Sequence, residues 1–269
     1  MVAAIAVVVV GATSAFFSDT ETSTGNTFAA GAIDLQIDNE SYATDPLTGN
    51  LALSTTTSWT LRDLTLEKFF NFSDVKPGDM GEDTISLHVN NNDSWLCADV
   101  SLTSNNDNTC TEPEGTDEGG NCGTDPGAGE LANHINFIWW ADDGDNVLED
   151  DENVLPGGPL GAIPVGATST VALADSVTNI WGPQGPLAGG SVRFIGKAWC
   201  FGDITPIPVQ QDGSGNTGTN GPLSSRGPGV GCSGASGLNN VTQTDSLTAD
   251  VAFRAVQSRN NAGFTCQQP

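Results

Sequence analysis

Alternation of apolar and polar residues along the chain predicts β-strands. Within residues 83–90, Ile85, Leu87 and Val89 share one face and polar side chains occupy the other, which is typical of a half-buried strand. No stretch keeps a 3.6-residue apolar period for more than about two turns, although residues 175–181 suggest a short helix. Similar strand signals occur at residues 27–38, 59–66, 69–72, 95–103, 135–141, 168–174, 191–201 and 247–255.

The composition supports an all-β domain with many turns. The chain has 269 residues, of which 37% are hydrophobic, with 33 Gly and 14 Pro, so it can bury a core and favours turns over long helices. About eight strands separated by turn signals indicate a β-sandwich or jelly roll. We predict one domain over residues 16–269, with loop insertions at 104–130 and 202–240.

The first fifteen residues are typical of a secretory signal peptide. Val2–Val10 is apolar and uncharged but falls short of the roughly 20 residues that a membrane span needs. Small residues follow it, and cleavage of the Ala15–Phe16 bond would free the rest of the chain. The basic start of a signal is missing, and the alternative is a buried strand at the start of a cytosolic domain. We expect a secreted, extracellular or cell-surface protein with no stable membrane span after signal removal.

The cysteines of an exported chain favour disulfides. Cys97 points away from the most apolar face of its strand, which suits a bond to a covering loop. Cys110 and Cys122 flank a Gly/Glu-rich loop and are a candidate local pair, but the sequence alone does not fix the pairing. A zinc site is disfavoured because no Cys-x-x-Cys occurs. The six cysteines are Cys97, Cys110, Cys122, Cys200, Cys232 and Cys266.

The chain is strongly acidic, and this excludes one class of partner. Its net charge of −25 comes from 8 Lys and Arg against 33 Asp and Glu, whereas nucleic-acid binding needs a basic surface. A surface this acidic also resists close association unless cations screen it.

Residues 142–152 hold the densest group of acidic side chains, with seven carboxylates in eleven positions. Seven carboxylates this close repel one another strongly without a counter-ion. Carboxylates, an Asn carbonyl and a Gly turn match the oxygen ligands and flexible geometry that calcium prefers. The pattern is not an EF-hand, because Val147 occupies the fifth position counted from Asp143, and a solvated acidic turn is the alternative. The candidate calcium ligands are Asp142, Asp143, Asp145, Asn146 and Glu149.

Two segments carry motifs of a known family. The first reads Phe-Phe-Ser-Asp-Thr-Glu at 16–21, Gly-Asn-Thr-Phe at 25–28 and Gly-Ala-Ile-Asp-Leu at 31–35, and the second reads Phe-Ser-Asp-Val-Lys-Pro-Gly-Asp at 72–79. They resemble the TasA and camelysin family, secreted proteins of biofilm matrices and archaeal pili. The resemblance covers roughly residues 12–38 and 69–102, and it implies a jelly-roll core with long decorated loops.

Residues 16–38 are predicted to act as a donor strand after signal removal. Phe16, Phe17 and Phe28 are apolar pegs in a polar strand-forming segment, and Ile33 and Leu35 follow them. Such a segment adds to the exposed sheet edge of a neighbour through backbone hydrogen bonds. Because donor and acceptor surfaces differ, the contact repeats head-to-tail into a fibre. The resemblance implies the same donor-strand complementation, and the alternative is pairing within the subunit.

The sequence shows little that indicates catalysis. His88 and His134 lie far apart along the chain, and no His-Glu-x-x-His occurs. Camelysin relatives are classed as metallopeptidases, but this chain offers no recognisable metal triad. We therefore predict a protein that is not an enzyme, a structural subunit of an extracellular filament or pilus whose partner is a further copy of itself. The alternatives are a camelysin-like metal-dependent peptidase and a calcium-stabilised monomeric adhesion module of the cell envelope.

Overall fold

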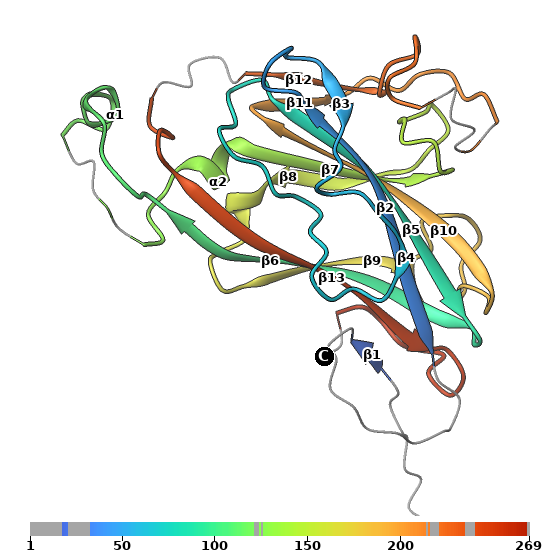
Figure 1. The fold of residues 1–269 in the computed structure, drawn as a ribbon. Coiled ribbons are helices and arrows are strands. Elements are labelled where there is room, and N and C mark those ends of the chain that lie inside the picture. The colour runs from blue at the N-terminus through green and yellow to red at the C-terminus, as the bar shows by residue number, and fades with distance from the viewer. Residues whose placement is uncertain are drawn as a thin grey trace, which may run out of the picture.

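Two antiparallel β-sheets face each other in the computed structural model of the chain (Figure 1). The structure describes residues 18–20, 33–120, 124, 126–213, 215, 221–234 and 240–267, and only the backbone of residues 18–20. The larger sheet has the order β3-β2-β5-β10-β7-β8, with β4 also paired to β2, and the smaller sheet has the order β1-β13-β6-β9. The prediction of an all-β sandwich is confirmed.

The strand bounds are as follows. The larger sheet contains β2 (Asp34–Thr44), β3 (Leu51–Leu53), β4 (Trp59–Arg62), β5 (Met80–Asn90), β7 (Ile135–Asp142), β8 (Val154–Pro159) and β10 (Ser191–Phe201). The smaller sheet contains β1 (Ser18–Thr20), β6 (Ser94–Asn106), β9 (Thr168–Ala174) and β13 (Ser246–Gln257). A separate hairpin-like pair joins β11 (Asp203–Pro206) to β12 (Val230–Ser233), and the helices are α1 (Glu112–Asp117), α2 (Leu131–His134) and the 3₁₀ helix η1 (Leu160–Ala162).

The core lies between the sheets and is built from the alternating faces that the sequence predicts. Every second residue of a strand points to the same side, so one face of each strand is apolar and turned inward. The inward residues of the larger sheet include Leu35, Ile37, Ile85, Leu87, Val89 and Ile195, and those of the smaller sheet include Leu96, Ala98, Phe253 and Ala255.

The outer face of the larger sheet is also covered. Trp140 and Ala198 pack there against Leu148 and Val230, which come from the acidic segment and from the 202–240 insertion. Both segments are thereby held against the sheet, and this packing positions the acidic side chains described below.

Gly196 makes room for the Trp140 ring on this outer face. A Cβ atom at Gly196 would overlap the indole ring, which is fully buried. We expect Gly196→Ala to lower the free energy of unfolding by about 1–3 kcal/mol, the usual cost of overpacking, as measured by urea denaturation. Gly263→Ala is the matched control, because nothing lies within 4 Å of a Cβ there. Equal midpoints for the two variants would contradict this account.

Three local features differ from the sequence prediction. Residues 69–72, which carry a strand signal, form no strand. Residues 175–181 do not form the expected helix, because the Asp175 carboxylate accepts hydrogen bonds from the backbone N–H groups of Val177 and Thr178 at 2.8 Å each, which favours a turn. Within the 104–130 insertion, α1 was not expected. A reciprocal capping box between Thr111 and Glu114 stabilises its start.

Two disulfides are defined among the described residues. Cys97 bonds to Cys266 in the C-terminal segment, on the side of β6 that faces away from the main core, as its predicted orientation required. Cys200 bonds to Cys232 and closes most of the 202–240 insertion. Cys110 is also disulfide-bonded, but Cys122 lies outside the described residues, so the Cys110–Cys122 pair stays a prediction.

Candidate metal centre

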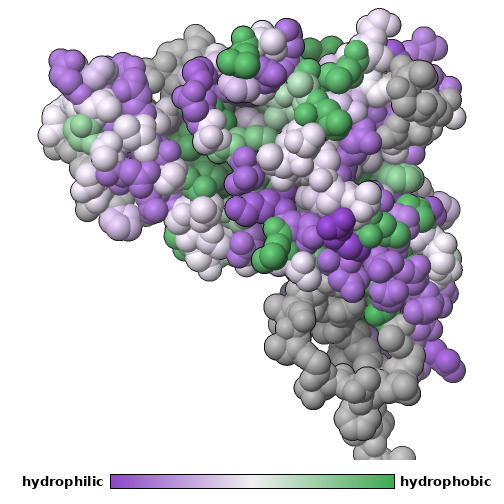
Figure 2. Space-filling model, viewed as in Figure 1, coloured by the Kyte–Doolittle hydropathy of each residue, from purple (hydrophilic) through white to green (hydrophobic). Residues whose placement is uncertain are grey.

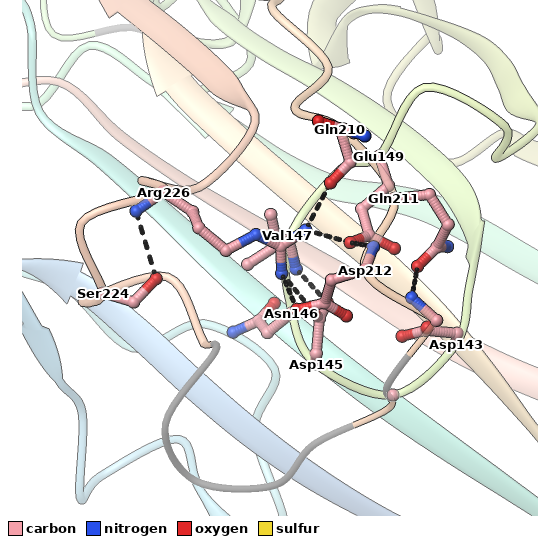
Figure 3. A network of polar contacts seen from close by, with 12 residues as sticks. Asp143, Asp145, Asn146, Val147, Glu149, Gln210, Gln211, Asp212, Ser224 and Arg226 are labelled. Carbon is pink, nitrogen blue, oxygen red and sulfur yellow. Dashed lines mark hydrogen bonds and ion pairs between the residues drawn. The ribbon is translucent and has the colours of Figure 1, made fainter.

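The acidic segment forms a compact loop directly after β7, against the outer face of the larger sheet (Figure 3). Gly144 and Asn146 turn the chain there, with φ values of +113° and +64°. Gly tolerates this left-handed region at no steric cost, and Asn is among the residues that enter it most readily. The tight turn brings carboxylates that are neighbours in sequence to one side of the loop.

Asp142 anchors the loop to the sheet. Its Oδ1 accepts a hydrogen bond from Trp140 Nε1 at 2.9 Å, and its Oδ2 accepts one from the Gly144 backbone N–H at 2.9 Å. The side chain is 5% exposed, and burial raises its pKa to about 7 despite these hydrogen bonds. Asp142 therefore stabilises the fold of the loop, since both of its carboxylate oxygens already accept hydrogen bonds from the protein.

Arg226 is the cation that the 202–240 insertion contributes to this loop. Its guanidinium lies 3.0 Å from Asp145 Oδ2 and 2.9 Å from Asp212 Oδ2, and it also pairs with Glu149. Gln210 adds a further contact, since its carbonyl accepts a hydrogen bond from Arg226 at 2.8 Å. Arg226 thereby ties the insertion to the acidic loop (Figure 3).

Two groups of three carboxylates meet in the loop, and Glu149 belongs to both. The first is Asp143, Glu149 and Glu152, and the second is Asp145, Glu149 and Asp212, with one oxygen of each residue within 4.8 Å of the others in its group. Arg226 neutralises part of the second group, so the first group is the less compensated of the two.

Buried oxygens in the first group have no protein partner among the described residues. Asp143 Oδ1 and Glu149 Oε2 are buried and accept no hydrogen bond, and the Glu149 side chain is completely buried. The Asn146 side chain nearby is 1% exposed, and neither atom of its amide is hydrogen-bonded to any described residue. Buried polar atoms in folded proteins almost always have partners, so these atoms point to a partner beyond the described residues, such as a bound ion.

The pKa values of several carboxyl groups in the loop are raised. Burial raises the pKa of Asp143 to about 6, of Asp145 to about 7 and of Glu152 to about 9, and neighbouring carboxylates add to each shift. Beneath the loop, Glu82 of β5 is fully buried and has no hydrogen bond to either oxygen. Burial, together with Asp142 and Asp83, raises its pKa well above the usual value. This excess of negative charge favours a bound cation.

The structure brings together the five residues that the sequence named. Asp142, Asp143, Asp145, Asn146 and Glu149 occur in one loop, and all but Asp143 are less than about a tenth exposed. Glu152, Asp212, Arg226 and Glu82 were missed. Glu152 is part of the same acidic run, whereas the other three are remote in sequence, and no local pattern signals them.

A third group of carboxylates lies away from the acidic loop. Asp107, Glu114 and Asp245 place oxygens within the same 4.8 Å range, where the end of β6, α1 and the start of β13 meet. Burial raises the pKa of Asp245, although the backbone N–H groups of Leu131 and Glu130 donate to it. Like the two groups in the acidic loop, this group consists only of carboxylates. It shares no residue with either of them, whereas those two groups share Glu149.

The histidines are separated in space as well as in sequence. His88 of β5 lies 3.6 Å from Asp38 and contacts Ser86, and His134 ends α2. Within the described ranges, no group of three metal-competent side chains includes a histidine.

The predicted donor-strand residues have two different outcomes. Ile33 and Leu35 belong to the core of their own subunit, at 8% and 1% exposed, so they are not part of a free segment. Phe16, Phe17, Phe28 and the Ala15–Phe16 bond lie outside the described residues. Of the segment between them, Ser18–Thr20 forms β1 and pairs with residues 254–256 of β13 in the same chain.

The rest of the β13 edge faces a groove. Within the described residues, 246–253 pair only with β6, and residues 247–251 line a groove with residues 64–72. Leu247, Ala249 and Val251 are half-buried and point toward the space between the sheets. Figure 2 shows apolar surface within a mainly hydrophilic face, in the hollow beside the first half of β13.

No helix among the described residues has the length and apolar character that crossing a membrane requires. Together, the two sheets and the acidic loop define a β-sandwich protein with a carboxylate-rich candidate metal centre.

A family comparison agrees with the motifs in the sequence. The model of the camelysin metallo-endopeptidase family matches residues 1–152, more than half of the chain, and the chain therefore belongs to this family. No curated protein matches it. The predicted TasA and camelysin membership is confirmed. The prediction that the chain is not an enzyme is contradicted, because the family is named for a metallo-endopeptidase.

The family name also implies a metal ion, and the ligand atoms of the described residues indicate which kind of ion they can bind. Every ligand in the three-residue groups is a carboxylate oxygen. Such oxygens suit hard cations such as calcium, whereas catalytic zinc is held mainly by histidines with at most one carboxylate. The described residues therefore fit a hard cation and do not form a histidine-bound zinc site.

Proposed function

We propose that the chain is a secreted subunit of an extracellular filament that assembles head-to-tail by donor-strand complementation. The observation that carries this proposal is the groove along the β13 edge. Among the described residues, 246–253 have no strand partner on that edge, and an exposed strand edge is a template for another strand. The sequence before β2, once freed by cleavage after Ala15, is the donor.

The inward side chains of β13 match this role. Leu247, Ala249 and Val251 alternate with exposed residues and are themselves only half-buried. An added strand could place alternate apolar side chains over them, which is how strand addition acquires its register. The phenylalanines Phe16, Phe17 and Phe28 are the apolar residues that the donor brings.

Strand β1 of the same chain already occupies part of the β13 edge, so a neighbour's donor segment can pair only with the remaining part. Three of the twelve residues of β13 are paired with the chain's own Ser18–Thr20. A neighbour's segment would extend along the remaining edge, from residue 253 toward residue 246. Ile33 and Leu35 are excluded from the donor, since both are buried in their own core.

Blocking the groove tests the proposal. Ala249→Arg should abolish filaments seen by negative-stain electron microscopy of the mature protein, because a long charged side chain would fill the space over the inward face. Ala252→Arg is the matched control, since Ala252 is exposed on the opposite face of the same strand. Circular dichroism should show that both variants keep the β-sandwich.

A second variant removes the donor together with β1, and leaves residues 246–253 of the acceptor edge unchanged. Deleting residues 16–26 should also abolish filaments, and mixing this protein with Ala249→Arg protein should not restore long fibres. Filaments that persist in either variant would refute donor-strand assembly at β13. Isolated particles of the unmodified mature protein would favour the monomeric adhesion module instead.

We further propose that calcium binds the Asp143–Glu149–Glu152 group, with Asn146 beside it and Asp145 and Asp212 completing the acidic surroundings. Buried oxygens of Asp143 and Glu149 that have no partner among the described residues support this assignment. An open cavity of about 270 Å³ borders Asp143 and Glu152 and would admit an ion. A bound cation would also reduce the repulsion that resists association of subunits this acidic.

A further inference from the structure

A charged pair lies between the two sheets, away from the metal centre. Lys197 of β10 and Asp83 of β5 are cross-strand partners and form an ion pair in which each side chain is 1% exposed. Their side chains share the inner face of the sheet with Ile85 and Ile195, two residues further along the same strands. Directly opposed residues hold their Cβ atoms about 4.5–5.5 Å apart, so the amine and the carboxyl are kept in contact.

Aromatic rings surround the amine. Lys197 Nζ lies 5.6, 5.8 and 6.0 Å from the ring centroids of Phe69, Phe70 and Phe137. Apart from the ion pair, no group in the described part of the chain makes a hydrogen bond of ordinary geometry with the amine or with Asp83. A buried ion pair without such hydrogen bonds does not recover its cost of desolvation. Transfer of one proton across the contact would convert the ion pair into a free amine beside a carboxylic acid, the form with no buried charge.

The carboxyl has polar neighbours on its other side. Ser41 of β2 is the second cross-strand partner of Asp83, and it accepts a hydrogen bond from Thr57 Oγ1 at 2.9 Å, which leaves its own hydroxyl hydrogen available to the carboxyl. Burial raises the pKa of Asp83, although Lys197, Ser41 and Asn39 lower it. Asp83 is thus biased toward the protonated acid, the form that can lose a hydroxyl group.

We propose that Lys197 and Asp83 condense to an intramolecular amide, an isopeptide cross-link between β10 and β5. The Nζ lone pair attacks Asp83 Cγ, and a C–N bond forms. The C–O bond to the acid hydroxyl then breaks, and the departing hydroxyl takes a proton from the nitrogen to leave as water. Ser41 is positioned to donate to the remaining oxygen while it carries negative charge. No oxidant, reductant or further reactant is needed.

The folded geometry supplies the driving force for this condensation. Amide formation from free acid and amine is unfavourable in water, but reacting groups held in contact reach effective molarities of about 10⁵–10⁸ M. Water released at Lys197 has a path outward, because a cavity of about 250 Å³ between the sheets reaches Lys197 and is lined by Trp139 and Val171. The cross-link would join two central strands whose linked residues are more than a hundred positions apart in sequence.

Mass spectrometry of the unmodified protein tests the proposal directly. After denaturation and reduction of the disulfides, the intact mass should be lower than the sequence mass by one water. Fragmentation of a protease digest should yield a branched peptide in which Lys197 and Asp83 are joined. This measurement does not depend on the folding of any variant.

Variants separate the cross-link from other losses of water. Lys197→Arg and Asp83→Ala should both show the full sequence mass, whereas Lys76→Arg, at an exposed lysine paired with Asp74, should keep the deficit. Asp83→Asn should reach the same final mass as the unmodified protein, since condensation with an amide releases ammonia and leaves the identical product.

Two results would overturn the proposal. One is a folded, unmodified protein with the full sequence mass, which would make the pair an ordinary buried ion pair. The other is a mass deficit without the branched peptide, which would place the loss of water elsewhere, for example at Asp143-Gly144 or Asp212-Gly213.

Discussion

Raising the pH of the metal-free protein from about 4 to about 8 should lower its free energy of unfolding, and calcium should restore it. The reason is the proton balance of the acidic loop. Asp142 and Asp145 have pKa values raised to about 7, and Glu152 to about 9. The folded protein therefore holds protons that the unfolded chain has already released.

The sign follows from that difference. Below the unfolded pKa of about 4, both states are protonated, and the loop carries no penalty. As the pH rises through the folded values, the carboxylates must ionise in a buried, repulsive site, and stability is lost. For Asp142, which is nearly fully buried, a shift of about three units corresponds to roughly 4 kcal/mol. The exposed members of the loop contribute less, because solvent screens them.

Calcium should remove this loss because it replaces the protons as the counter-charge. A ligand at about 100 times its dissociation constant stabilises a folded protein by about 2.7 kcal/mol, which for a chain of this size is a rise in Tm of roughly 5–10 °C. Thermal melts at pH 5 and pH 8, each with calcium and with a chelator, measure both effects. The calcium effect should be largest at pH 8.

A matched pair of variants assigns the effect to the loop. Glu149→Gln should abolish the response to calcium, because Glu149 belongs to both carboxylate groups. Glu112→Gln should leave it intact, since Glu112 is an exposed residue of α1. A Tm that ignores calcium at both pH values, or a metal-free protein that is more stable at pH 8 than at pH 5, would contradict the assignment.

Lys197→Met should destabilise the protein by about 3–5 kcal/mol, the cost of leaving one partner of a buried ion pair without the other. Asp83 would then be a carboxyl in an apolar core with no cation near it. The double variant Lys197→Met/Asp83→Leu should recover much of the loss, because two apolar side chains of similar volume need no compensation. Urea denaturation of the three proteins measures the effect.

The comparison also separates burial from covalent linkage. The double variant lacks any amide between β5 and β10, so its remaining deficit relative to the unmodified protein reports the cross-link. Lys76→Met, which removes an exposed ion pair with Asp74, should change stability little. Equal stabilities for the single and double variants would show that Asp83 carries no penalty without Lys197.

The strands could be predicted because their signal is local. In β5 and β6 the apolar residues recur with a period of two and form the inward set, from Ile85 to Val89 and from Leu96 to Leu102. The half-buried character predicted for β5 is wrong, because residues 81–87 are buried on both faces. The acidic loop was recognisable for the same reason, since residues 142–152 are contiguous. Family membership could also be predicted from local signals, because the motifs at residues 16–35 and 72–79 are short stretches within the matched residues 1–152.

The partners of these segments could not be predicted in the same way. Asp212 reaches Glu149 across 63 positions, and Arg226 reaches Asp145 across 81, and no periodicity links residues so far apart. Nothing in the sequence around Lys197 indicates that its side chain is buried, because a single lysine in a strand is normally exposed. Its place inside the sandwich follows only from the pairing of β10 between β5 and β7.

By itself, the sequence determined the strand faces, the acidic loop and the family, since each depends on residues close together along the chain. Only the tertiary structure decided which acids meet one arginine, that Ile33 and Leu35 stay in their own core, and that residues 246–253 of β13 have no second strand partner among the described residues. The physical reason is that these features depend on which strands pair and which faces become covered. Those choices are settled by the packing of the whole sandwich and leave no mark in any short stretch of sequence.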